Sequence, residues 1–189
     1  MSNVPDDGRR PDVADLLEVR AGEAMELNQR YLNPQLGRVV KTLGFDRDWA
    51  HGRGSLLIDR EGNEYLDLLS GYGVFALGRS HPYVKDQLAR VLAADLPSLP
   101  QLGTTTLAGV LAERLVELAP DPLDAVVLCS SGTEAVEGAL KLARAATGRP
   151  RILYCERGFH GLTLGSVSVN GNEEFRERFW PFLPGCESV

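Results

Sequence analysis

A run of small hydroxyl and glycine residues, SSGT at 130–133, lies between an apolar run and a helical pattern. The apolar run, DAVVLC at 124–129, predicts a buried strand, and residues 134–147 predict a helix. A strand that leads directly into a helix presents unpaired backbone N–H groups and the positive end of the helix dipole, which together bind phosphate. Ser131 and Glu134 also fit a capping box, which needs no ligand. Two interpretations therefore stay open, a phosphate site and a plain helix cap.

The next predicted strand is also followed by residues suited to a ligand. RILYCE at 151–156 predicts a buried strand, and the loop RGFHG at 157–161 follows it. Ligands in open α/β sheets gather at the carboxyl ends of strands, so both loops can face one crevice. There Phe159 would lie flat against an aromatic ligand, and His160 would donate a hydrogen bond to it. A Phe-His pair between glycines is more often a packed loop, but the two loops together favour a site for a phosphorylated ring.

The glycine-rich segment GYGVFA at 71–76 fits the relaxed dinucleotide fingerprint GxGxxA. That fingerprint requires a helix that begins inside the motif, whereas Gly78 and Pro82 favour irregular chain up to residue 81. The acidic residue found about 20 positions later, Asp95, ends a predicted helix and not a strand. We therefore expect no Rossmann site in this segment. Tyr72 keeps two interpretations, a buried turn or a loop that lines a substrate site.

The remaining polar residues indicate structure more than chemistry. Glu137 and Lys141 are four positions apart on a predicted helix, a spacing that supports a helix surface. His81 precedes Pro82 and is expected to cap the helix that begins there. The cysteines have neither CxxC spacing nor paired histidines, so we expect free thiols and no metal site. They are Cys129, Cys155 and Cys186.

The elements that must position these residues follow from apolar periodicity and turn residues. Residues 12–33 predict one amphipathic helix, and residues 54–69 predict a hairpin around a DREGN turn. Further helices are expected from Pro82 to about residue 95 and over 107–118. The strand, helix and strand over 124–156 predict a βαβ unit, and hence an α/β fold.

Length and composition are typical of a soluble globular protein. The 189 residues allow one domain or a domain with an appendage, and 43% are hydrophobic and 24% charged. The formal charge of −6 makes a nucleic-acid or anionic-membrane partner unexpected. Residues 1–11 predict a disordered lead, and the stretch MSNVPDDGRRPD is polar and acidic, without the basic start and apolar stretch of a signal peptide. We therefore expect a cytoplasmic protein.

Three blocks of this sequence resemble one known family, the class III aminotransferases, which are fold-type I pyridoxal-phosphate (PLP) enzymes. The blocks are LDLLSGYGVFALGRSHPYV at 66–84, SSGTEAVEGALKLAR at 130–144 and GFHGLTLGSVSV at 158–169. They come in the family's order and spacing, and they are most similar to the putrescine and ornithine aminotransferase branch. The resemblance implies a fold-type I α/β fold with an incomplete sheet. Residues 12–95 would form an N-terminal arm helix, a hairpin and a glycine-rich segment in the small domain, and residues 96–189 the first part of the PLP-binding large domain.

The resemblance also implies roles for the residues singled out above. Those that would hold the cofactor phosphate are Ser131, Gly132 and Thr133. Phe159 would stack on the pyridine ring with His160 beside it, and Tyr72 would line the substrate pocket. The expected reaction moves an amino group from an amine, diamine or ω-amino acid to a keto acid such as 2-oxoglutarate. The expected enzyme is a homodimer without nucleic-acid, membrane or metal partners.

Two departures from the family change what this chain is expected to do. Ornithine-type members resemble FHGR where this chain has Leu162, and that arginine grips a substrate carboxylate, so a diamine or another ω-amine fits better here. The family's Schiff-base lysine lies beyond position 189, and none of Lys41, Lys85 and Lys141 stands in a matching place. We therefore expect no catalytic residue in this chain, which would be inactive alone. The alternatives are a degenerate fragment or interaction partner without catalysis, and another fold-type I enzyme such as an aminomutase or racemase.

Overall fold

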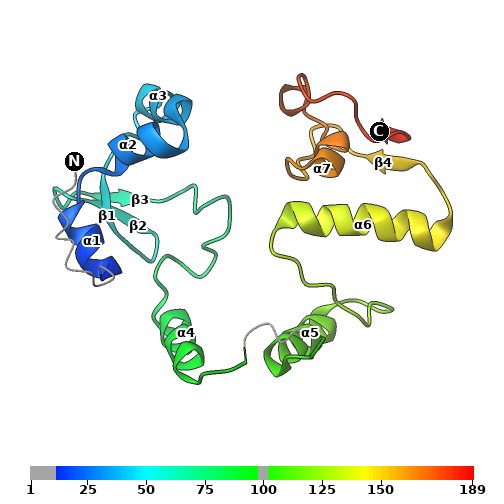
Figure 1. Cartoon of the computed structure of the whole chain (residues 1–189), viewed down its shortest axis with the longest axis horizontal. Coiled ribbons are helices and arrows are strands. Elements are labelled where there is room, and N and C mark those ends of the chain that lie inside the picture. The colour runs from blue at the N-terminus through cyan, green and yellow to red at the C-terminus, as the bar shows by residue number, and fades with distance from the viewer. Residues whose placement is uncertain (1–11, 98–101) are drawn as a thin grey trace. The chain divides into compact units, whose positions relative to one another are not determined.

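A computed structural model describes residues 12–97 and 102–189 of the chain. The predicted disordered lead, residues 1–11, lies outside the described residues. The chain divides into two compact units, one up to Leu96 and one from Pro97 onward (Figure 1). The assignment of residues 12–95 and 96–189 to a small and a large domain stays a prediction.

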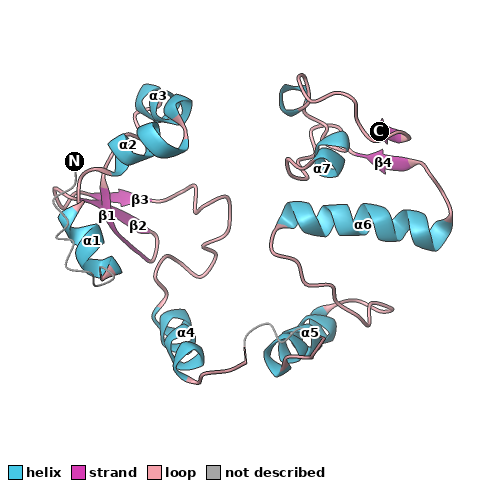
Figure 2. Ribbon diagram, viewed as in Figure 1, coloured by secondary structure: helices cyan, strands magenta, loops and turns pink. Residues whose placement is uncertain are grey.

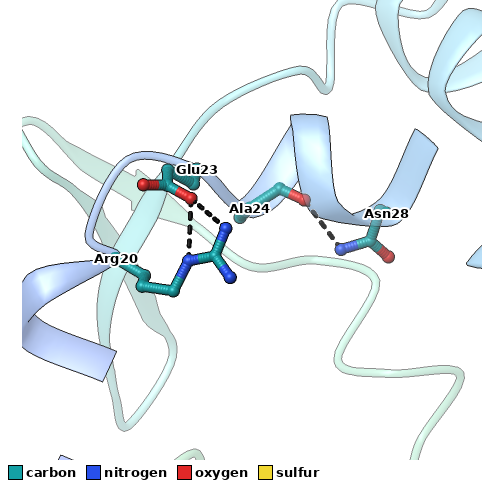
Figure 3. A network of polar contacts seen from close by, with 4 residues as sticks. All are labelled: Arg20, Glu23, Ala24 and Asn28. Carbon is teal, nitrogen blue, oxygen red and sulfur yellow. Dashed lines mark hydrogen bonds and ion pairs between the residues drawn. The ribbon is translucent and has the colours of Figure 1, made fainter. Parts of the chain in front are cut away.

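The first unit begins with helices that are shorter than predicted. The single helix expected over 12–33 is wrong, because the chain forms α1 (Val13–Val19), α2 (Ala24–Leu27) and a π-helix, η1 (Asn28–Leu32). Between α1 and α2 the chain turns at Gly22, whose φ of +90° lies in the left-handed region. Arg20 Nε donates to the Glu23 carboxylate at 2.8 Å across this turn, and the Asn28 side-chain amide donates to the Ala24 carbonyl at 2.8 Å (Figure 3).

A further helix, α3 (Pro34–Thr42), follows where the sequence predicted none. Its start has two favourable features, Pro34 in the first turn and the side chain of Asn33 at the N-cap. The Asn33 side-chain oxygen accepts from the backbone N–H groups of Gln35 and Leu36, at 2.9 and 3.2 Å. The Asn-Pro pair therefore begins a helix as well as ending the one before it.

A three-stranded antiparallel sheet follows these helices in the first unit. The strands are β1 (Trp49–Arg53), β2 (Leu56–Asp59) and β3 (Glu64–Leu66), in the order β1-β2-β3. The β2–β3 pair confirms the predicted hairpin, and Asp59 closes its turn by accepting from the Asn63 backbone N–H at 2.8 Å. Strand β1 was not predicted, because WAHGR does not alternate between apolar and polar residues.

The glycine-rich segment and a helix follow the sheet. Residues 71–77 form turns and no helix, so the segment lacks the helix that a dinucleotide fingerprint requires, and α4 (Pro82–Ala93) begins at the expected proline. His81 occupies the N-cap position of α4, but its side chain makes no capping hydrogen bond, so that expectation is wrong. Within the part of the chain that the structure describes, no helix is both long and apolar enough to cross a membrane.

The second unit contains the long helix that the sequence predicted and a short parallel sheet (Figure 2). Its helices are α5 (Thr106–Leu118), α6 (Gly132–Thr147), α7 (Leu164–Ser168) and the 3₁₀-helix η2 (Glu173–Phe175). Strands β4 (Ile152–Tyr154) and β5 (Cys186–Ser188) pair in parallel. The predicted strand at 151–156 is thus confirmed as β4, and its partner comes from the end of the chain.

The strand predicted over 124–129 is wrong for this structure. These residues pair with no strand among the described residues, and Val127 and Leu128 are exposed. A strand is defined by its partners, and the only parallel partner of β4 in the described ranges is β5. The expected βαβ unit is therefore absent as a paired unit, and the sheet is incomplete. The buried core of this unit is small, and it is centred on α7 and the residues that follow it, Val169 and Asn170.

Candidate functional site

The start of α6 is compatible with both interpretations that the sequence left open, a helix cap and a phosphate site. Ser131 is the N-cap, and its hydroxyl accepts from the Glu134 backbone N–H at 3.3 Å and donates to the Glu134 carboxylate at 3.0 Å. The cap leaves two donors unused, because the backbone N–H groups of Gly132 and Thr133 have no hydrogen-bond partner among the described residues. These donors lie at the positive end of a 16-residue helix. A capped helix and an anion site are therefore compatible at this position.

The Thr133 side chain is not part of this candidate anion site, because it contacts the loop before α7 and the start of α7. Its hydroxyl lies 2.7 Å from the Thr163 hydroxyl and donates to the Ser166 hydroxyl at 2.9 Å. The Thr163 backbone N–H donates to the same Thr133 oxygen at 3.3 Å, and the Ser166 hydroxyl donates to the Thr133 carbonyl at 3.1 Å. Thr133 therefore offers a ligand its backbone N–H, while its hydroxyl joins α6 to the loop.

Glu137, one turn further along α6, caps the start of α7. Its Oε1 accepts from the Thr163 hydroxyl at 2.6 Å and from the backbone N–H groups of Gly165 and Ser166 at 2.8 and 3.1 Å. The hydrogen bond from Thr163 does most to hold the pKa of Glu137 below its ordinary value of 4.5, and the bonds from the two backbone groups add to it against the opposing effect of burial. The helix-surface interpretation of Glu137 is thus incomplete, since its carboxylate is committed to another element.

The loop after β4 holds Phe159 and His160. Phe159 is 59% exposed as a residue, and its ring packs edge-on against Phe175, with the ring centroids 5.3 Å apart. The fully buried Asn170 holds the loop, because its side-chain oxygen accepts from the His160 backbone N–H at 2.7 Å and its amide donates to the Gly161 carbonyl at 2.9 Å. The loop is therefore fixed while much of the Phe159 ring stays accessible.

The structure brings some of the predicted site residues together. Ser131, Gly132 and Thr133 are joined through Thr133 to the segment that follows Phe159 and His160, all within the second unit. The supporting residues Thr163 and Asn170 were missed, because no local pattern distinguishes them from ordinary loop residues. Glu137 was seen only as a partner of Lys141, since the sequence does not show what lies across from a helix.

Tyr72 belongs to the first unit, on the glycine-rich segment. Its φ is +57° and its side chain is 90% exposed, so the interpretation as a buried turn is wrong. An ion pair braces the segment, because Arg79 Nε lies 2.7 Å from the nearly buried Asp67 carboxylate and the guanidinium lies 4.2 Å from the Phe75 ring centroid. The hydrogen bond from Arg79 holds the pKa of Asp67 below its ordinary value. This exposed tyrosine is free to contact a ligand.

The sequence around this site is similar to that of known aminotransferases. Residues 41–189 match the family described as Aminotransferase class-III. The acetylornithine aminotransferase of Methanopyrus kandleri is 39% identical over 171 residues, which are 88% of this chain and 41% of that protein. The putrescine aminotransferase of Pectobacterium atrosepticum is 37% identical over 175 residues, 88% of this chain and 37% of that protein. The chain thus spans less than half the length of these relatives.

The fold is also that of a solved aminotransferase. The ornithine aminotransferase of Toxoplasma gondii superposes with a TM-score of 0.77 over 96% of this chain and 44% of that chain, at 23% sequence identity. This likeness shows a fold-type I architecture with an incomplete sheet. The match of the family over residues 41–189 covers most of the sequence. The chain therefore belongs to the class III aminotransferase family.

Proposed function

We propose that this chain supplies the phosphate cup and the ring-stacking wall of a pyridoxal 5′-phosphate site in an aminotransferase. The observation that carries this proposal is the pair of free N–H groups at Gly132 and Thr133, at the start of a long helix and in the same unit as the accessible ring of Phe159. The family supports it, and so does the solved Toxoplasma structure, whose description places PLP at the active site. The residues present fit this cofactor.

The phosphate and the pyridine ring of the cofactor each have matching groups in this chain. Gly132 and Thr133 would donate their backbone N–H groups to the phosphate, with Ser131 beside them. Phe159 would pack on the pyridine ring, and His160 would stand next to it. The bound cofactor supplies the electron sink for moving an amino group. The chain's own residues bind it, orient its ring and keep water from one of its faces.

The proposed reaction transfers an amino group from an amine, diamine or ω-amino acid to a keto acid such as 2-oxoglutarate, in a homodimer. We propose that none of the chain's lysines forms the Schiff base, because none stands where the family's sequence has that lysine. Lys41 lies on α3 and Lys85 on α4. Lys141 stands eight residues after Thr133 on α6, about 12 Å along the helix axis at 1.5 Å per residue. We therefore propose that the chain alone does not catalyse transamination.

The amino donor that we propose is a terminal amine that is not bound through an α-carboxylate. Leu162 lies in the loop that follows His160, its side chain is 62% exposed, and it brings no positive charge. Tyr72, exposed on the glycine-rich segment, is the proposed substrate-lining residue. Putrescine, the substrate in the name of one relative, is a donor of this kind.

The test of this function uses pyridoxamine 5′-phosphate, whose amine does not react with surface lysines. We expect the chain to bind it at least about tenfold more tightly than pyridoxamine, because the phosphate gains charge-assisted hydrogen bonds. Gly132→Pro should remove one donor and weaken binding about tenfold, yet leave the helix intact because proline is tolerated in the first turn and a Cβ at this position meets nothing within 4 Å.

The matched control is Gly132→Ala, which keeps the N–H group and should bind like the parent chain. Equal affinity for pyridoxamine with and without its phosphate would refute the proposed site. The same samples treated with PLP and borohydride should show no stoichiometric pyridoxyl adduct on one lysine by mass spectrometry. A single lysine modified to completion would show that the chain does hold its Schiff-base residue.

A further inference from the structure

Two elements of the second unit are joined by a polar clamp, which we define as Thr133 and Glu137 of α6 with Thr163 and Ser166 at the start of α7. Every polar side-chain group of Thr163 and Ser166 has a partner on α6. The backbone N–H groups of Thr163 and Ser166 also donate to α6 side chains. The clamp is thus a set of mutual hydrogen bonds and not a single contact.

Two glycines allow the elements of the clamp to approach this closely. A Cβ added at Gly161 would overlap the Thr133 side chain, and one added at Gly165 would overlap the Glu137 carboxylate. A larger residue at either glycine would displace the α6 side chain that it meets, Thr133 or Glu137, or move the loop away from α6. Glycines on both sides of Thr163 in the sequence therefore allow the short distance between the loop and α6.

The clamp joins the two segments that carry the groups proposed to hold the cofactor. Thr133 contributes both the N–H of the phosphate cup and a hydroxyl of the clamp. Phe159 stands four residues before Thr163, on a loop that Asn170 makes rigid. The contact of Thr163 with α6 therefore links the segment that follows the ring wall to the helix that carries the phosphate cup.

We propose that Glu137, acting through Thr163, is a positioning residue that sets the distance between the ring wall and the phosphate cup without touching the cofactor. The proposal rests on the proposed function, and it assigns a task to a residue outside the cup. The carboxylate suits that task because one oxygen receives three donors from the loop and α7, and a charged acceptor makes stronger hydrogen bonds than a neutral one. The contact of Phe159 with the pyridine ring should therefore depend on Glu137, whereas the contacts of the cup with the phosphate should not.

The experiment measures binding of pyridoxamine 5′-phosphate and of inorganic phosphate to the full chain. We expect Glu137→Gln and Thr163→Val each to weaken pyridoxamine 5′-phosphate about tenfold, a change of about 1.4 kcal/mol, while phosphate affinity changes less than about twofold. The double variant should bind little more weakly than the worse single variant, because both variants weaken the same hydrogen bond between Thr163 and residue 137. Thr163→Ser keeps the hydroxyl and should restore binding to within about threefold of the parent.

A glutamate outside the clamp provides the control. The Glu113 side chain on α5 has no hydrogen bond or ion pair in the described part of the chain, so Glu113→Gln should bind like the parent. Without ligand, amide hydrogen exchange at residues 158–166 should be faster in Glu137→Gln and unchanged in Glu113→Gln. This exchange readout does not depend on any cofactor.

The outcomes separate the clamp from the proposed function. Equal losses of phosphate and of pyridoxamine 5′-phosphate in Glu137→Gln would overturn the positioning role, because they would mean general damage to the unit. Unchanged binding together with unchanged exchange would overturn it as well. If the parent chain binds pyridoxamine with and without its phosphate equally, the proposed function fails, whatever the exchange data show about the clamp.

Discussion

Glu137 illustrates how one side chain can take a role that its neighbours in the sequence do not indicate. Four residues before Lys141 on a helix, it fits a surface pair, and the Coulombic effect of Lys141 is the smallest of the influences on its pKa. The larger influences are hydrogen bonds from Thr163, Gly165 and Ser166, residues 26 to 29 positions later in the chain. Contacts over such separations come from the fold, so a helical pattern alone does not reveal them.

The lowered pKa of Glu137 makes the stability of the second unit depend on pH. Because the folded state holds this pKa below the ordinary value of 4.5, the charged form stabilises the fold above that value, and the contribution is lost as the pH falls through the folded pKa. We expect the free energy of unfolding to fall between about pH 5 and pH 3, and to fall less steeply in Glu137→Gln, which does not titrate.

Urea unfolding followed by the fluorescence of Trp180 measures this in the second unit, in a Trp49→Phe background that removes the only other tryptophan. Glu113→Gln serves as the control and should keep the slope of the parent chain. An identical pH slope in Glu137→Gln and the parent would show that the carboxylate is not held by these hydrogen bonds.

At the scale of elements, the sequence predicts best where the signals are local. Helix α6 has an N-cap, an apolar stripe and a glycine C-cap, and its predicted range of 134–147 agrees with the observed Gly132–Thr147. Helices α4 and α5 and the β2–β3 hairpin also carry their own start and stop residues. The run at 124–129 has strand composition but no partner in the described residues, and composition cannot supply one. The residues proposed for the phosphate cup were predicted from the same kind of local signal, whereas the clamp was not predicted.

Two glycines of α6 allow a matched pair of substitutions with opposite expected effects. Gly148 is the C-cap with a φ of +66°, so Gly148→Ala should destabilise the fold by about 1 kcal/mol through backbone strain alone, since a Cβ there meets nothing within 4 Å. Gly138 lies inside the helix with equally open space, so Gly138→Ala should stabilise it by about 0.5–1 kcal/mol. Urea unfolding checks both, and a loss of stability in Gly138→Ala would contradict an open, regular helical conformation at this residue.

At the scale of the whole molecule, the proposed functions are divided between the two units. The second unit contains the residues proposed for the cofactor, and the first contains Tyr72, the residue proposed for the substrate. Both units keep their candidate residues on segments braced by polar contacts, the clamp in one and the Asp67–Arg79 ion pair in the other. A carboxylate that orients a loop is thus a feature that the two units share.

The proposed choice of amino donor is tested at Leu162, in an active aminotransferase that includes this chain. We expect a higher kcat/KM for putrescine than for N-acetylornithine, because the exposed Leu162 offers no partner to an α-carboxylate. Leu162→Arg should raise the ratio of N-acetylornithine to putrescine at least about tenfold, the value of one charge-assisted hydrogen bond of about 1.5 kcal/mol. Leu164→Arg adds the same charge two residues later, at the start of α7, and should leave the ratio near that of the parent. A parent enzyme that already turns over N-acetylornithine far faster than putrescine would rule out a terminal-amine donor.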